Sequence, residues 1–165
     1  MSEPSEHTTS REHVTSLANR ADQFEVAPVE LGERWAKYGK WDRAYFPSLV
    51  GMEIEEVRLD YCRMRLPFKD ELEQPAGVMH GGAIATLLDS VVVPAVGCRY
   101  TPEARMSTVD MHVQFMSAVV RDDLVAEGWI VRRGRTVVFC ESEARAASTG
   151  KLVARAVLTF NVAIP

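Results

Sequence analysis

One long apolar segment dominates the pattern of hydrophobic and polar positions along the chain. It covers residues 81–98 and is interrupted by a single carboxylate, Asp89. A helix that is apolar on every side needs cover on every side, so the segment predicts a buried central helix. A buried carboxylate is costly unless it is paired or used. We therefore expect the functional site to involve Asp89 and the start of this helix.

The pattern changes to a period of two after the helix. Apolar residues alternate with polar ones from Thr108 to Phe115, which predicts a strand with one buried face. Short connections around Gly134 and Gly150 separate the strands that follow and suit hairpins. The predicted order is two strands, a helix and four strands in a meander, an α+β fold in which an antiparallel sheet curls around the helix. The expected strands are 51–59, 61–66, 108–115, 124–132, 136–147 and 152–162.

The first part of the chain differs from the rest. Residues 1–30 carry few large apolar side chains, so we expect a loose extension there, with at most a short helix over 11–24. The domain then spans 31–165. Its first segment, 31–45, is predicted to be helical, with an aromatic stripe that docks on the domain and consists of Trp35, Tyr38, Trp41 and Tyr45.

Composition narrows the classes of function. The chain has 165 residues, enough for one domain, and its net charge of −4 argues against nucleic acid as a partner. Cys62, Cys98 and Cys140 are far apart and no Cys/His cluster exists, so neither a disulfide framework nor a metal site is expected. The first thirty residues have no apolar core like that of a signal peptide, and Asp89 makes a membrane span a poor interpretation of 81–98. We expect a cytoplasmic protein without membrane contact.

Polar residues at fixed spacing surround the start of the predicted helix. Gly77 precedes His80-Gly81-Gly82, Gln74 lies six residues before the histidine, and Asp89 lies nine residues after it. Leu88 and the run Thr108-Val109-Asp110 complete the pattern. In this order, residues 51–162 resemble the hotdog-fold acyl-CoA thioesterases of the phenylacetic-acid-degradation (PaaI) type. The resemblance implies a hotdog fold of five to six strands around a central helix, hydrolysis of acyl-CoA, no cofactor, and a homodimer or a dimer of dimers.

Each of these residues then has an expected role. The first N–H groups of a helix have no intrahelical partner, and Gly81 and Gly82 let an acyl carbonyl approach them as in an oxyanion hole. Gln74 would donate a further hydrogen bond, and His80 would hold the turn. The alternative for the two glycines is that they only permit close packing.

Asp89 would be the nucleophile or the general base, and Thr108 would orient it or an attacking water. The alternatives are a carboxylate that neighbouring donors merely satisfy and an ordinary strand threonine. Gly82 and Asp89 are seven residues apart, about 10.5 Å along a helix. Because a side chain cannot bridge that distance, both groups can serve one substrate only if a second subunit supplies the carboxylate.

The rest of the expected substrate site is less specific. Arg132, Arg133 and Arg135 are candidates for contacts with the phosphates of coenzyme A, or else a solvated hairpin tip. Met79, together with Leu88 and Val92, would line the acyl pocket. The competing functions are a non-catalytic acyl-CoA-binding or sensing module, because fold does not fix function, and a hotdog hydratase.

Overall fold

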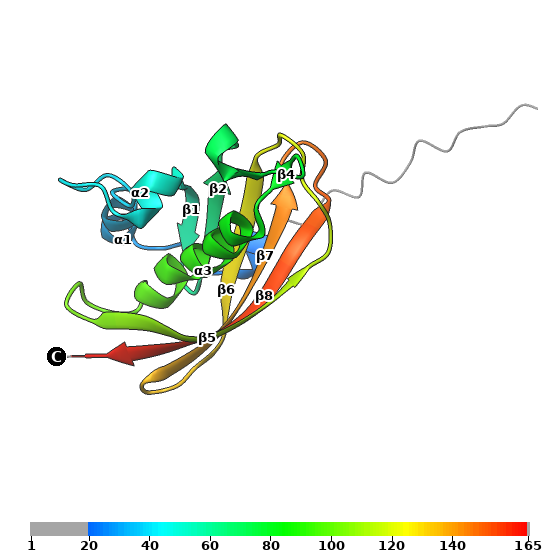
Figure 1. The fold of residues 1–165 in the computed structure, drawn as a ribbon. Coiled ribbons are helices and arrows are strands. Elements are labelled where there is room, and N and C mark those ends of the chain that lie inside the picture. The colour runs from blue at the N-terminus through cyan, green and yellow to red at the C-terminus, as the bar shows by residue number, and fades with distance from the viewer. Residues whose placement is uncertain (1–19, 165) are drawn as a thin grey trace, which may run out of the picture.

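A single long helix lies across the curved sheet at the centre of the molecule (Figure 1). The computed structural model describes residues 20–164. The helix, α3 (Gly81–Gly97), is 17 residues long, and 11 of them are buried, which confirms the predicted central helix. The predicted α+β class is also confirmed, since six antiparallel strands form one sheet in the order β1-β2-β6-β7-β8-β5.

The remaining elements are short or belong to this sheet. Its strands are β1 (Glu53–Arg58), β2 (Tyr61–Leu66), β5 (Arg105–Phe115), β6 (Leu124–Arg133), β7 (Val137–Ala146) and β8 (Leu152–Ala163). A two-stranded sheet joins β3 (Glu73–Gln74) to β4 (Val78–Met79). The short helices are the 3-10 helices η1 (Arg20–Gln23) and η2 (Asp70–Leu72) and the α-helices α1 (Val29–Trp35) and α2 (Phe46–Val50).

The predicted four-stranded meander is wrong for one strand. β6, β7 and β8 do form a meander, but β5 pairs with β8 rather than with β6. Both sides of β6 are taken by β2 and β7, so the free edge available to β5 is beside β8. The chain between β5 and β6 crosses the end of the sheet, where buried Val119 accepts a hydrogen bond from the Met79 N–H at 2.8 Å.

The single helix predicted over 31–45 is also wrong. Only α1 overlaps that segment: it ends at Trp35, α2 begins at Phe46, and Gly39 lies between them with a φ of 80°, a conformation that a right-handed helix cannot contain. Each aromatic ring still contacts the next one along the chain: the ring centroids of Tyr38 and Trp41 are 5.2 Å apart, and those of Trp41 and Tyr45 are 5.3 Å apart. Trp35 is buried, so the stripe is anchored on the domain as expected.

The segment before α1 lies on the outer face of the sheet, the face opposite α3. Ala21 is fully buried, Phe24 stacks on Tyr61 with ring centroids 5.1 Å apart, and the Arg20 guanidinium lies 3.6 Å from the Trp129 ring centroid. Packing therefore begins before residue 31, where the pattern places the start of the domain. Most of the short helix predicted over 11–24 lies outside the described residues.

Two contacts set how closely α3 approaches the sheet. A Cβ added at Gly128 of β6 would lie 2.8 Å from a methyl carbon of Val92 and 2.9 Å from one of Val91. The buried Ser142 hydroxyl of β7 donates to the Leu88 carbonyl at 3.0 Å. The helix therefore rests directly on the backbone of β6 and is hydrogen-bonded to β7.

This close approach makes Gly128 sensitive to substitution. Gly128→Ala should lower the free energy of unfolding by roughly 1–3 kcal/mol, since the added methyl pushes α3 away from the sheet. Gly32→Ala is the matched control, because a Cβ there meets nothing within 4 Å and alanine favours the helix. Urea denaturation of both variants measures the difference. Equal stability of Gly128→Ala and the parent would contradict the packing argument.

Candidate functional site

The first turn of α3 is capped by its own histidine. His80 is the N-cap residue, and its Nδ1 accepts a hydrogen bond from the Gly82 N–H at 2.8 Å. Nδ1 therefore acts as the acceptor of this cap. A Cβ at Gly82 would lie 2.9 Å from Nδ1, so glycine is needed for this contact. The Gly82 N–H, predicted as an oxyanion donor, is occupied by the cap.

The N–H group that stays available is that of Gly81, the residue before Gly82. The Ala83 N–H bonds to the His80 carbonyl at 2.9 Å, whereas the Gly81 N–H has no hydrogen-bond partner among residues 20–164. A Cβ at Gly81 would lie 3.5 Å from the Phe115 ring, an ordinary contact. The open donor at the positive end of the helix is therefore that of Gly81, beside an aromatic ring that the pattern did not identify.

Asp89 lies two turns further along the same helix and contacts the edge strand. The Thr108 hydroxyl donates to its Oδ1 at 2.8 Å. Burial raises the pKa of the Asp89 carboxyl above its usual value, and the hydrogen bond from Thr108 opposes that rise. The structure thus brings Asp89 and Thr108 together as predicted. A carboxylate of raised pKa with one firm donor is suited to accept a proton or to attack a carbonyl carbon.

The connection before α3 places the other predicted residues at its start. Gln74 ends β3 and is half-buried, and a turn closed by its carbonyl and the Gly77 N–H at 2.9 Å leads into β4. Gly77 has a φ of 75°, which explains the glycine at this position. Met79 is 2% exposed and packs in the hydrophobic core, so in a single chain it does not face a ligand as predicted. Leu88 and Val92 are likewise fully buried.

The arginine cluster lies at the opposite end of α3. Arg133 donates to Asp60 at 2.6 Å and to the carbonyls of Val96 at 3.0 Å and Ala95 at 3.1 Å. Its charge thus stabilises the C-terminal end of the helix, where the macrodipole is negative. This corrects its predicted role as a free phosphate contact. Arg132 and Arg135 are exposed at the β6–β7 hairpin.

Tyr38 is a site neighbour that the sequence pattern assigned only to the aromatic stripe. Its hydroxyl faces Ser90, the residue after Asp89. Burial raises the pKa of Tyr38 to about 12, and the nearby Asp89 carboxylate adds to that rise. A pattern along the chain cannot pair residues 38 and 90, because their contact depends on how α1 and the turn after it pack on α3.

Metal-ligating side chains do not gather anywhere in residues 20–164: no three of His, Cys, Asp and Glu lie in a suitable group. Cys62, Cys98 and Cys140 are buried free thiols. Within the same described part of the chain, no helix has the length and apolar character needed to cross a membrane.

Comparison with known sequences identifies one family. Residues 76–153 match the family model described as the thioesterase superfamily. Acyl-coenzyme A thioesterase 13 of Mus musculus is 32% identical over 95 residues, which are 57% of this chain and 66% of that protein. The matched region therefore spans slightly less than two thirds of that relative.

Comparison with solved structures gives the same fold. A conserved protein of Pseudomonas aeruginosa is 26% identical with a TM-score of 0.68, over 73% of this chain and 95% of that one. The PaaI protein of the Escherichia coli phenylacetic acid degradation operon has a TM-score of 0.71 over 82% of this chain and 95% of its own. At 12% identity, the second likeness concerns the fold alone. The hotdog architecture implied by the sequence resemblance is confirmed.

The hydrogen bond from Thr108 lowers the pKa of the Asp89 carboxyl and so opposes the effect of burial. Thr108→Val removes the donor that opposes the effect of burial, so the pKa of Asp89 should rise further above its usual value. Ionised Asp89 would then be lost at a higher pH as the solution is acidified. Thr108→Ser keeps a hydroxyl and should stay close to the parent. Carboxyl ¹³C shifts followed through a pH titration measure the value, and an unchanged pKa in Thr108→Val would disprove the coupling.

Proposed function

We propose that the chain hydrolyses acyl-CoA thioesters to a free acid and coenzyme A, because residues 76–153 match the thioesterase superfamily model and the chain has a hotdog fold. The observation that carries the proposal is the half-buried Asp89, which accepts a hydrogen bond from Thr108 of β5. Asp89 lies on α3, the helix that also presents the open Gly81 N–H. A thioester needs a polarised carbonyl and either a nucleophile or an activated water, and these two groups supply both functions.

The Gly81 N–H would polarise the thioester carbonyl. It lies at the N-terminal end of α3, where the helix dipole is positive and the absence of a side chain leaves room for the acyl group. Gln74, at the end of β3, would add a hydrogen bond to the carbonyl or to the attacking water. His80 would act indirectly, because its ring holds the first turn through the Gly82 N–H.

Asp89 would supply the attack. In one route its carboxylate removes a proton from water, the resulting hydroxide attacks the carbonyl carbon, the C–S bond breaks and the proton passes to the leaving thiolate. In the other, the carboxylate itself attacks and expels the thiolate, and water then hydrolyses the mixed anhydride. Both routes balance without a metal or a cofactor.

Asp89 and Gly81 of one chain cannot serve the same carbonyl. They are eight residues apart on a helix, about 12 Å along its axis, which is beyond the reach of an aspartate side chain. We therefore propose that the carboxylate comes from a second subunit whose α3 runs antiparallel to the first. A two-fold dimer of this kind contains two equivalent sites.

The edge of the sheet beside Asp89 is unpaired and apolar, and this supports the proposed dimer. β5 is an edge strand with exposed apolar side chains: Val109 is 64% exposed, Phe115 56% and the adjacent Met116 45%. An unpaired apolar edge is avoided in monomers because it promotes association. A second copy of this chain, alone or within a dimer of dimers, would cover it.

Contacts with coenzyme A would come from Arg132 and Arg135. They lie near the C-terminal end of α3, a helix length away from Gly81 of the same chain. With the partner's Asp89 beside Gly81, antiparallel packing would place the partner's arginines about 12 Å farther along the helix axis, where they would meet the coenzyme A part of the substrate rather than the carbonyl. The assignment to the PaaI type, based on His80-Gly81-Gly82 and Asp89, is part of this proposal. So is a cytoplasmic location, which the three free thiols support.

Removal of the Asp89 charge tests its role in the chemical step. Asp89→Asn preserves size and can still accept from Thr108, so KM should change little while kcat falls by roughly a hundredfold or more. Asp110→Asn on β5 is the matched control and should retain activity. A thiol-trapping assay over a panel of acyl-CoA substrates measures both. Parental kcat in Asp89→Asn would exclude the assignment.

Subunit complementation tests the composite site. Asp89→Ala and Gly81→Val should each be inactive, the second because its side chain blocks approach to the Gly81 N–H. Co-expression at equal levels makes half the dimers mixed, each with one intact site, so about a quarter of parental activity should return. Mixed dimers that form and show only the activity of the single variants would place each site within one chain.

A further inference from the structure

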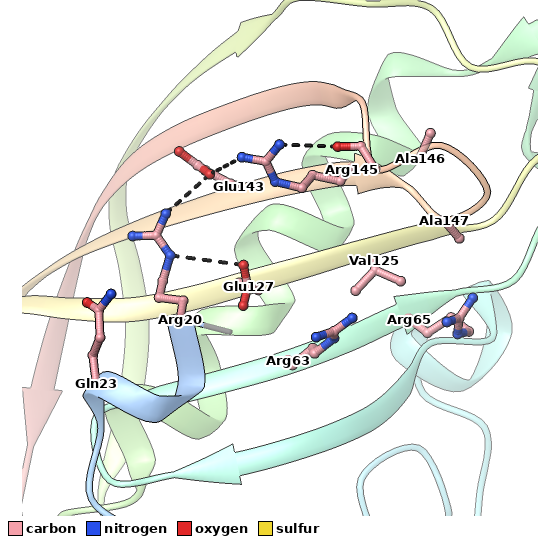
Figure 2. A pocket seen from close by; sticks show the side chains of 11 residues that line it. Arg20, Gln23, Arg63, Arg65, Val125, Glu127, Glu143, Arg145, Ala146 and Ala147 are labelled. Carbon is pink, nitrogen blue, oxygen red and sulfur yellow. Dashed lines mark hydrogen bonds and ion pairs between the residues drawn. The ribbon is translucent and has the colours of Figure 1, made fainter. Parts of the chain in front are cut away.

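A cavity lies on the outer face of the sheet, away from α3 and the site described above. Its volume is about 420 Å³, within the range of small-ligand pockets. Strands β2, β6 and β7 form its floor, and η1 forms one wall (Figure 2). Four arginines line it against two glutamates, although the chain as a whole is acidic: Arg20, Arg63, Arg65, Arg145, Glu127 and Glu143.

Strand register divides this floor into two rows of different charge. In one row, Arg63 lies opposite Glu127 and Glu127 opposite Glu143, so acids and bases are mixed. In the next row, Val125 lies between Arg65 and Arg145, with no acid among the three. Residues two apart on a strand share a face, so both rows line the same side of the sheet. Val125 is thus flanked by two arginines, one on each neighbouring strand.

The acids of the first row are already neutralised. Glu143 is 7% exposed and accepts hydrogen bonds from Arg155 and Arg145, both at 3.0 Å, and from Arg20 at 3.3 Å. Burial opposes its ionisation, but these arginines hold the pKa of its carboxyl below the usual value. Glu127 accepts from the Tyr61 hydroxyl at 2.7 Å and forms a looser ion pair with Arg20 at 4.0 Å. The acids of this row therefore have partners other than Arg63 and Arg65.

One carboxylate clamps both of those arginines and leaves donors free. Glu55 lies at a bulge in β1 and accepts from Nε of Arg63 at 2.9 Å and from Nε of Arg65 at 2.6 Å. Asp123 takes one more donor of Arg65, at 3.2 Å. Within residues 20–164, both terminal nitrogens of Arg63 and Nη2 of Arg65 have no hydrogen-bond partner. Two preorientated guanidinium groups therefore stand side by side on β2 (Figure 2).

We propose that this cavity binds a small organic anion, whose carboxylate or phosphate oxygens are held by Arg63 and Arg65 and whose apolar part packs on Val125, Ala146 and Ala147. Paired guanidinium donors match the oxygens of such a group, and clamping by Glu55 lowers the entropy lost on binding. Arg145 lines the cavity on the other side of Val125, where Glu143 and the Gly150 carbonyl hold its terminal nitrogens. The proposal is independent of the thioesterase activity, because none of these residues belongs to that site.

Calorimetric titration of the full chain at low salt tests the site with benzoate, phenyl phosphate and neutral benzamide. Saturable binding of at least one anion is expected, weakened by salt, with no binding of benzamide. Which anion binds identifies the preferred group. Arg63→Met and Arg65→Met should each weaken binding by about tenfold or more. Arg99→Met is the control: it removes an equal charge from an exposed ion pair with Asp60, and binding should be unchanged.

A second variant keeps every arginine. Val125→Glu places an acid between Arg65 and Arg145, which would satisfy both and should abolish anion binding while circular dichroism shows a folded chain. Absence of saturable binding by both anions overturns the proposal. So does equal binding of benzamide, or parental affinity in folded Arg63→Met, Arg65→Met and Val125→Glu.

Discussion

The direct contact of α3 with the backbone of β6 is the constraint on which the rest of the structure depends. Gly128 permits it, and the hydrogen bond from Ser142 to the Leu88 carbonyl holds the helix to the next strand. A helix held in this way keeps its residues at fixed distances along its axis. The separation of Gly81 from Asp89 is therefore set by helical rise, and it is the reason for proposing a site shared between two subunits.

The two ends of this helix are satisfied in different ways, and the proposed site depends on the difference. At the C-terminal end, Arg133 binds two of the last carbonyls and is itself paired with Asp60. At the N-terminal end, His80 caps the Gly82 N–H and the Gly81 N–H stays open. One donor at the positive end of the dipole is left for a ligand, and the flanking turn is rigid enough to hold it in place.

The two faces of the sheet have separate tasks. Its inner face is apolar and covers α3, while its outer face carries a network of ion pairs around Glu143 and Glu55. The segment over residues 20–26 packs on that outer face and forms one wall of the cavity beside Arg63 and Arg65. The proposed thioesterase site and the proposed anion site are thus on opposite sides of one layer.

The amino-acid sequence alone determined the central helix and the strand positions after it, and it made Thr108 a candidate partner of Asp89, because apolar periodicity and motif spacing are local properties of the chain. It led to errors where contacts are distant in sequence: β5 beside β8, Arg133 turned onto the end of α3, and Met79 in the core. The choice of Gly81 over Gly82 as the open donor also required the structure, because it depends on the rotation of the His80 ring. Tertiary structure decided these points, since strand order, side-chain pairing and burial follow from which surfaces pack together, and a linear pattern does not contain that information.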